Sequence, residues 1–510
     1  MQNAKGLGRR GFVKGVGMAA LAVGFFDIKE TKVFMDSPGV PHHPDMLSTE
    51  LQAPPRIKGN PGSDGYWDHV RKAFPLPDNY IHMNTGTTGS QPLFSLSNLG
   101  VYNLYKSMDP RDWEKNLNAR FPDLFPTTAS AIAARQAAIA AMYGANDDEI
   151  VLSYCTTDAC NLIFAGTPWN TGDRIITTHW EHPATAGPTA WARDYHGVEV
   201  RIVELPTNFT SSITKADVLG LFEAELNRAL GAGNKQYLVV SEIFYKNGLR
   251  LPIKELTTLA RSYGAYTIID TAHGWGQIPI NCHDYGADFI CGAGHKWLCG
   301  GPGTGIFYIR NSGSDLPPFS LGNFSSYGDL FVVPSARYDN RNWSPAGAMQ
   351  GRGETNTPAL YAMTDSASFF NAVGLANIYA RSVAMGDHLK QKIAAQWGPR
   401  ALWVQKNPDP AFATALTSFN PFAGRDKASQ FSAMNAAMQS VLNTLAAEDP
   451  RIYIRTVTWH DRASDSADNR IGFRVSTHAM YNNFEQVHYM FERLVAAVNA
   501  TGLPQLLPAT

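Results

Sequence analysis

Cysteine is scarce in this chain. Only five of its 510 residues are cysteines, and no two of them form a Cys-x-x-Cys pair. The spacing of the five therefore gives no zinc site, and we expect no metal. Most lie in stretches expected to be buried, where cysteine acts as a small apolar side chain. An oxidising compartment would still leave room for one disulfide.

An excess of charge of either sign is also lacking. Lys and Arg number 43 and Asp and Glu 44, so the formal net charge is -1 at pH 7. Without a basic excess or a run of like charges, nothing favours nucleic acid or another polyelectrolyte as a partner. Hydrophobic residues make up 44% of the chain. That content is ample for a large core and for two or three folding units.

The apolar run near the N-terminus, Val16 to Phe26, is too short to span a bilayer as a stable helix. It follows a stretch that resembles the twin-arginine export signature, Gly8-Arg9-Arg10-Gly11-Phe12-Val13-Lys14. We expect residues 1–35 to be a signal read by the twin-arginine machinery, which moves folded proteins. The protein would then be periplasmic or secreted. A basic tail before a short helix is the alternative, and no clean cleavage site is present.

Three apolar strands follow one another between Tyr237 and Gly305, with a helical pattern between the first two. The second strand ends on Asp270, and Lys296 lies just past the third. In parallel β/α structure, strands present reactive groups at their C-terminal edge. An acid and a lysine at adjacent strand ends are what pyridoxal phosphate (PLP) chemistry uses. Taken alone, a lysine after a strand is more often a surface residue, and an aspartate at a strand end is more often a turn residue. The two together, with a histidine near each, favour a PLP site.

The motifs around these two residues are Asp270-Thr271-Ala272-His273 and His295-Lys296-Trp297. They resemble the class V aminotransferase family, and within it the isopenicillin N epimerase-like branch. With the export signal, the chain is also similar to periplasmic PLP enzymes that tailor pyoverdine siderophores. The resemblance implies PLP fold type I, an α/β fold. Its expected parts are an N-terminal arm at residues 36–80, a large domain with a mostly parallel seven-stranded sheet at 81–345, and a small α+β domain at 346–510.

The resemblance also implies a set of cofactor contacts. Lys296 would form the Schiff base with PLP, and Asp270 would hold the pyridine nitrogen protonated. His182 would stack on the ring, with His179 or Trp180 as competitors for that role. The remaining expected contacts are to the phosphate from Thr156, Thr157 and His295, and to the ring oxygen or a substrate group from His273. Thr156 and Thr157 sit at a strand-to-helix junction, where free backbone N–H groups favour an anion; an ordinary N-cap is the alternative.

Other positions are expected to meet the substrate or a second subunit. Arg474 matches the family arginine that grips the α-carboxylate through two parallel hydrogen bonds. Asn84 and Thr85 lie in a turn that the family places near the substrate. Thr355, in a segment that resembles the family's Gly-Thr-x-Asn, would reach the phosphate of the neighbouring subunit, so we expect a homodimer with composite sites. Glu354 beside it would repel phosphate.

The sequence leaves the reaction open. The expected substrate is a small amino acid or peptide-like metabolite, with Lys296 as acid and base at Cα. Epimerisation, transamination and lyase or oxidative chemistry all remain. No cysteine lies between Trp459 and Ile471, where cysteine desulfurases of this superfamily carry their mobile one, which argues against persulfide chemistry of that type. A carbon–sulfur lyase and a non-catalytic binding protein are the alternatives.

Overall fold

A computed structural model describes residues 49–125, 131–310, 345–350, 354–460 and 469–508. The expected signal, residues 1–35, lies outside these ranges. Contacts between residues group Met46–Thr510 into one compact unit. Within the described ranges, no helix combines the length and apolar character needed to cross a membrane. All five cysteines are described and none forms a disulfide, although the Sγ atoms of Cys160 and Cys291 lie 3.3 Å apart.

The centre of the fold is a seven-stranded sheet with the strand order β2-β8-β7-β6-β5-β3-β4. Its strands are β2 (Ile150–Ser153), β3 (Arg174–Thr178), β4 (Glu199–Val203), β5 (Gln236–Ser241), β6 (Tyr266–Asp270), β7 (Phe289–Ala293) and β8 (Gly305–Ile309). Only β8 runs against the others, since it pairs antiparallel with both β2 and β7. The predicted mostly parallel seven-stranded sheet is therefore confirmed.

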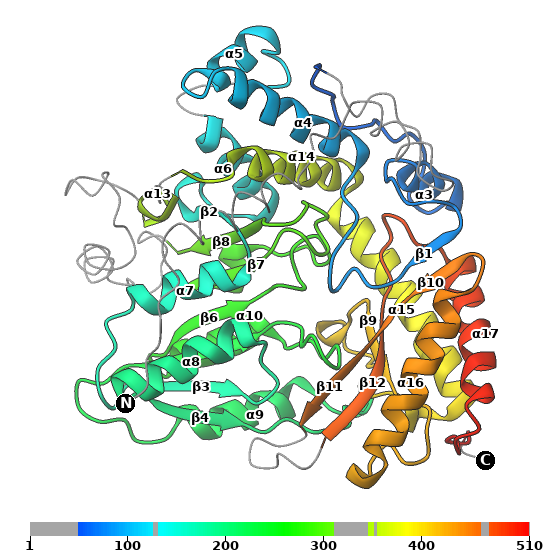
Figure 1. Cartoon of the computed structure of the whole chain (residues 1–510). Helices are drawn as coiled ribbons and strands as arrows, with labels where there is room; N and C mark the ends of the chain where they lie inside the picture. Colours follow the sequence, from blue (N-terminus) through cyan, green and yellow to red (C-terminus); the bar gives the residue numbers. More distant parts are fainter. Residues whose placement is uncertain (1–48, 126–130, 311–344, 351–353, 461–468, 509–510) are drawn as a thin grey trace, which may run out of the picture. The chain divides into compact units, whose positions relative to one another are not determined.

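Apart from the edge strand β4, both faces of this sheet are buried, which explains why its inner strands are mostly apolar. Along β5, Tyr237 and Val239 join one hydrophobic cluster with side chains of α7, whereas Leu238 and Val240 join another with side chains of α9 and α10. This alternation is the two-residue period of a strand. The helices that surround the sheet in Figure 1 are α6 (Ala131–Tyr143), α7 (Thr156–Gly166), α8 (Pro183–His196), α9 (Lys215–Leu226) and α10 (Ile253–Ser262). The short helix α11 (Cys282–Tyr285) precedes β7.

The C-terminal part is an antiparallel sheet of order β11-β12-β9 with helices packed around it (yellow to red in Figure 1). Its elements are α15 (Leu375–Trp397), β9 (Leu416–Phe419), α16 (Phe431–Ala446), β10 (Arg451–Tyr453), β11 (Arg455–His460), β12 (Asn469–Ser476) and α17 (Phe484–Ala500). Strand β1 (Tyr80–His82) pairs in parallel with β10. Thus residues expected to open the large domain form a sheet with the C-terminal part, and the boundary at residue 345 stays a prediction.

Five further α-helices lie outside these two groups in the described residues. They are α3 (Asp64–Arg71), α4 (Leu93–Met108), α5 (Trp113–Arg120), α13 (Pro345–Gln350) and α14 (Thr357–Val373). Helix α14 packs against α4 and α6 as well as α15. The sequence did not predict α4 and α5, because their polar and aromatic residues give a weak helical period.

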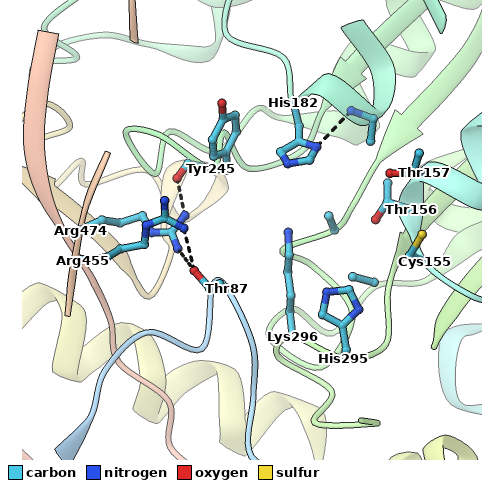
Figure 2. Close-up of a pocket in the computed structure, with 14 residues that line it drawn as sticks. Thr87, Cys155, Thr156, Thr157, His182, Tyr245, His295, Lys296, Arg455 and Arg474 are labelled. Atoms are coloured by element: carbon cyan, nitrogen blue, oxygen red, sulfur yellow. Dashed lines mark hydrogen bonds between the residues drawn. The ribbon is translucent and has the colours of Figure 1, made fainter. Parts of the chain in front are cut away.

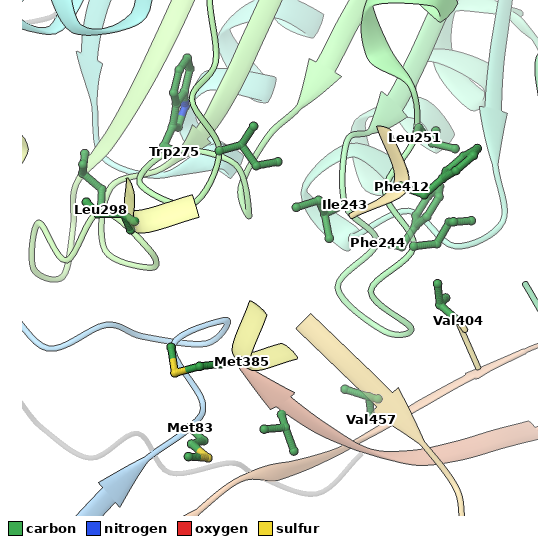
Figure 3. Packing of buried hydrophobic residues seen from close by; sticks show 14 of the residues in the cluster. Met83, Ile243, Phe244, Leu251, Trp275, Leu298, Met385, Val404, Phe412 and Val457 are labelled. Carbon is green, nitrogen blue, oxygen red and sulfur yellow. The ribbon is translucent and has the colours of Figure 1, made fainter. Parts of the chain in front are cut away.

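One hydrophobic cluster joins the loops at the strand ends to the C-terminal sheet. Ile243, Phe244 and Leu251 follow β5, and they belong to the same buried cluster as Val404 and Val457 of the C-terminal part (Figure 3). Because this core is continuous, the two sheets are held in a fixed relation at the edge where Asp270 and Lys296 lie.

Gly89, in the segment after β1, lies against the backbone that carries Lys296. Its N–H donates to the carbonyl oxygen of His295 at 2.9 Å. A Cβ atom on Gly89 would collide with the carbonyl oxygen of Lys296 and with Cys299. Glycine is therefore required here by close approach and not by an unusual backbone angle.

We predict that Gly89→Ala lowers the free energy of unfolding by about 1–3 kcal/mol, the usual cost of overpacking a filled interior. Urea unfolding followed by circular dichroism measures this. The matched control is Gly220→Ala in α9, where an added Cβ meets nothing within 4 Å. If Gly89→Ala and Gly220→Ala were equally stable, the close contact between Gly89 and the backbone of Lys296 would be contradicted.

Candidate active site

A cavity of about 330 Å³ opens at the C-terminal edge of the parallel strands. Segments that follow β2, β3, β5, β6 and β7 form most of it, and the turn after β1 and strands β11 and β12 complete it. Figure 2 shows its lining, which consists of Gly86, Thr87, Cys155, Thr156, Thr157, His182, Ala184, Tyr245, Ala272, Ala293, His295, Lys296, Arg455 and Arg474.

Lys296 projects its amine into the middle of this cavity (Figure 2). Its Nζ lies 3.4 Å from Nε2 of His273, whose Nδ1 accepts the indole N–H of Trp297 at 3.1 Å. Burial holds the pKa of His273 well below its usual value, so the ring is neutral. Because Nδ1 accepts a hydrogen bond, the ring proton sits on Nε2 and faces the amine. In this pair the amine of Lys296 is therefore the acceptor, which requires its unprotonated form.

Asp270 ends β6 and is buried, with Oδ1 accepting the N–H of Ala272 at 2.8 Å. Burial raises its pKa to about 6, while the Lys296 charge and the Ala272 N–H act in the opposite direction. Burial also lowers the pKa of Lys296 to about 8, against the attraction of Asp270. The acid and the amine predicted at adjacent strand ends are thus electrostatically coupled in one buried site.

The first turn of α7 forms another wall of the cavity. Thr156 and Thr157 both line it, as does Cys155 at the helix N-cap. The Oγ1 atom of Thr156 is buried and has no hydrogen-bond partner among the described residues. An unsatisfied buried hydroxyl beside free helix N–H groups suits an anion such as phosphate.

His182 and His295 flank Lys296 in the cavity (Figure 2). His182 caps α8, its Nδ1 accepting the N–H of Ala184 at 3.1 Å, and its ring meets the ring of Tyr245 edge-on at 4.9 Å. Burial, followed by the charge of Lys296, lowers its pKa to about 4, so the ring is neutral. Neither alternative for the stacking role, His179 or Trp180, belongs to the described lining.

Arg474 and Arg455 form the wall opposite α7 (Figure 2). Arg474 is buried, and it donates to the backbone oxygen of Tyr245 at 2.8 Å, to Asn84 at 3.0 Å and to Thr87 at 2.7 Å. Burial lowers its pKa to about 9, and the neighbouring Arg455 acts in the same direction. The guanidinium remains charged at neutral pH.

Five of the predicted site residues do not line the cavity of this chain: Asn84, Thr85, Asp270, His273 and Thr355. Asp270 and His273 are buried beside Lys296. Asn84 contacts Arg474 instead, and the hydroxyl of Thr85 bonds to that of Tyr481. Thr355 lies near Lys106, which donates to its backbone oxygen and pairs with Glu354. The expected role of Thr355 toward a neighbouring subunit stays a prediction.

Four residues near the cavity were not predicted. Thr87 and Arg455 face it from the turn and from β11, and Cys155 lies beside the threonine pair. Glu181 is buried beneath, accepting hydrogen bonds from the N–H and hydroxyl of Ser241 and from the hydroxyl of Thr178. Arg455 lies opposite Arg474 only through the register of β11 against β12, which no local sequence pattern reveals.

The sequence profile described as Aminotransferase class-V matches residues 111–490. An isopenicillin N epimerase of Streptomyces clavuligerus is 23% identical, covering 67% of this chain and 82% of its own. A "probable cysteine desulfurase" of Methanothermobacter thermautotrophicus is also 23% identical, and the match covers 69% of this chain and 81% of the relative. Among solved structures, the apo cysteine desulfurase of Thermococcus onnurineus NA1 aligns with a TM-score of 0.62 at 18% identity. The alignment covers 88% of this chain and 100% of that structure.

The arrangement is that of a PLP fold type I protein, with an acid and a lysine at adjacent strand ends of a mostly parallel sheet. Specifically, the chain belongs to the class V aminotransferase family. Its cofactor is PLP. The residues present fit this group, because the unsatisfied Thr156 hydroxyl at the α7 N-terminus suits a phosphate, and Asp270 and Lys296 supply the acid and the amine.

We predict that Thr156→Val weakens PLP binding about tenfold, because a hydrogen bond to a charged group is lost without a change of shape. Titration of the apoprotein with PLP, followed by tryptophan fluorescence, measures the dissociation constant. Thr189→Val is the matched control, since Thr189 in α8 is also buried with an unpaired hydroxyl and lies outside the cavity lining. Unchanged affinity in Thr156→Val would remove this threonine from the phosphate site.

Glu181 predicts a pH dependence of stability. Burial raises its pKa from 4.5 to about 8, with the hydrogen bonds of Ser241 acting in the opposite direction. A carboxyl with a raised folded pKa stabilises the fold at low pH, and this contribution is lost as pH rises from about 4.5 through about 8. Between pH 6 and 9, wild type should therefore lose more stability than Glu181→Gln.

The expected difference exceeds about 1.4 kcal/mol, the equivalent of one pKa unit. Urea unfolding of both proteins at the two pH values, in the same cofactor state, measures it. Parallel pH profiles for wild type and Glu181→Gln would show that Glu181 ionises normally.

Proposed function

We propose that this protein is a PLP-dependent enzyme that acts at the amino group or Cα of an amino acid or peptide-like metabolite. The observation that carries the proposal is the amine of the partly buried Lys296, which lies beside the buried Asp270 and His273 and faces a cavity with an arginine wall. The presence of both Asp270 and Lys296 argues against a binding protein without catalysis, and the pKa of Lys296, lowered to about 8, suits a catalytic amine.

Bound PLP supplies an electron sink for the bond broken at Cα. The chain's own contribution is to hold groups and to move protons. Asp270, charged near neutral pH, would hold the pyridine nitrogen of PLP in its protonated form through its buried carboxylate. Lys296 has the pKa and position for an acid and base at Cα, since a fraction of its amine is unprotonated near pH 7. His273 holds that amine in place through Nε2.

The arginine wall orients the substrate. A guanidinium opposite α7 attracts the α-carboxylate, which turns the amino group and Cα toward Lys296 (Figure 2). Arg474 is fixed for this task by its bonds to Tyr245, Asn84 and Thr87. His182, which is neutral, provides an uncharged ring beside Lys296 to cover the cofactor face.

The relatives catalyse different reactions, so carbon–sulfur bond cleavage is a second candidate function. An isopenicillin N epimerase supports chemistry at Cα, whereas a hercynylcysteine sulfoxide lyase of Schizosaccharomyces pombe, 22% identical, supports carbon–sulfur bond cleavage. The latter spans 49% of this chain and 59% of its own. We favour amino-group or Cα chemistry, because the motif resemblance is to the epimerase branch. The absence of a cysteine from Trp459 to Ile471 argues only against persulfide chemistry of the desulfurase type.

The test compares purified wild type with Lys296→Ala. We expect wild type to show the visible absorbance of covalently held PLP, and Lys296→Ala to lose it, because Lys296 supplies the amine whose charge acts on Asp270. Lys254→Ala is the control, since that lysine is exposed and pairs with Asp284. Wild type that shows no such absorbance after PLP is added would overturn the proposed function.

The same proteins distinguish the reactions. Wild type incubated with amino acids in D₂O should incorporate deuterium at Cα, which NMR detects, and Lys296→Ala should not. Release of pyruvate or sulfur species without Cα exchange of unreacted substrate would favour the lyase instead. Formation of a keto acid together with a change in the PLP spectrum would identify transamination.

A further inference from the structure

Arg455 and Arg474 lie directly opposite each other on the antiparallel strands β11 and β12. Both donate to the same hydroxyl, since Nη1 of Arg455 lies 3.0 Å and Nη2 of Arg474 lies 2.7 Å from Oγ1 of Thr87. That hydroxyl in turn donates to Oδ1 of Asn84 at 3.0 Å. Its two lone pairs and its proton are all used, so Thr87 holds the two guanidinium groups side by side.

No carboxylate of the described chain pairs with either arginine. The acidic groups closest to the cavity serve other partners: Asp270 is coupled to Lys296, and Glu181 has a pKa of about 8 that leaves it mainly protonated at pH 7. Two positive charges therefore share one wall without a counter-charge from the described residues. Such an arrangement is costly unless a ligand neutralises it.

The two arginines differ in how many donors they have left. Arg474 uses three of its five N–H groups on Tyr245, Asn84 and Thr87. Arg455 uses only two, with Nε donating to the backbone oxygen of Thr456 at 3.0 Å and Nη1 to Thr87. Arg455 is partly exposed and lines the cavity. It therefore presents more free donors to a ligand than the fully buried Arg474.

The phosphate of the cofactor does not explain the pair. The α7 N-terminus, where the unsatisfied Thr156 hydroxyl lies, is across Lys296 from the arginine wall (Figure 2). A single α-carboxylate carries one negative charge, and the wall carries two positive ones. Charge complementarity thus calls for a substrate with two anionic groups on this side.

We propose that Arg455 binds a second anionic group of the substrate, so that the enzyme takes an amino acid, free or at the end of a peptide, with an acidic side chain. Arg474 holds the α-carboxylate and Arg455 the side-chain carboxylate, with Thr87 positioning both. This inference rests on the proposed function, because it needs an amino acid bound at Lys296.

The test uses the PLP-loaded full chain and matched ligand pairs. L-glutamate and L-glutamine have nearly the same shape and differ by one charge, as do L-aspartate and L-asparagine. Binding is followed by the change in PLP absorbance. In wild type, we expect at least one acid to bind about tenfold or more tightly than its amide, the fold-change of a charge-assisted hydrogen bond.

Variants of the two arginines then separate their roles. Arg455→Gln should bring the ratio of acid affinity to amide affinity close to one. Arg455→Lys should leave an intermediate ratio, because the charge remains but the two parallel hydrogen bonds of a guanidinium are lost. Arg474→Gln should weaken acid and amide alike. Arg400→Gln, which removes an exposed arginine paired with Asp426, is the control for charge and should keep the wild-type ratio. Thermal unfolding confirms that each variant is folded.

Three outcomes overturn the inference. Equal binding of acid and amide to wild type would show that no second anion is read. If Arg455→Gln lost the same affinity for the acid as for the amide, both arginines would hold the α-carboxylate. If no amino acid changes the spectrum of wild type that holds PLP, the proposed function fails together with the inference, whereas in the first two outcomes the proposed function stands.

Discussion

The burial of one amine constrains the whole site. Lys296 is enclosed where the parallel strands end, and taking its charge out of water lowers its pKa to about 8 despite Asp270. The neutral His273, oriented by Trp297, accommodates the unprotonated form. Without the surrounding core the amine would be an ordinary exposed cation. The fold therefore acts on the chemistry mainly by removing much of the water around this amine.

That exclusion depends on two sheets that are far apart in the sequence. The parallel sheet supplies Asp270 and Lys296, while β11 and β12 supply the arginine wall. A continuous cluster of buried side chains fixes the distance between them (Figure 3). The first strand, β1, pairs with β10 and brings the turn that contains Thr87 against both arginines. Cofactor contacts and substrate contacts are thus built by separate parts of the chain.

The sequence predicted the half of the site that is local in the chain. Asp270 and Lys296 follow strands with strong apolar runs, and in parallel sheets the positions of such residues follow from strand order alone. The turn after β1 was predicted to lie near the substrate. The prediction named Asn84 and Thr85 from this turn, whereas Thr87 is the residue that lines the cavity. The choice depends on the pairing of β1 with a strand about 370 residues later, which no local pattern reveals. Arg455 was missed for the same reason, since its role depends on its register with Arg474.

The register of β11 against β12 has a consequence for how such enzymes diverge. Alternate residues of a strand point to opposite faces, so a slip of one residue would turn Arg455 away from the cavity and bring a neighbour such as Thr456 toward it. The parallel sheet, and with it Lys296, would not change. A single insertion or deletion near this hairpin could therefore exchange one class of substrate for another while the reaction at Cα is kept, a route to new specificity that needs no mutation in the catalytic centre.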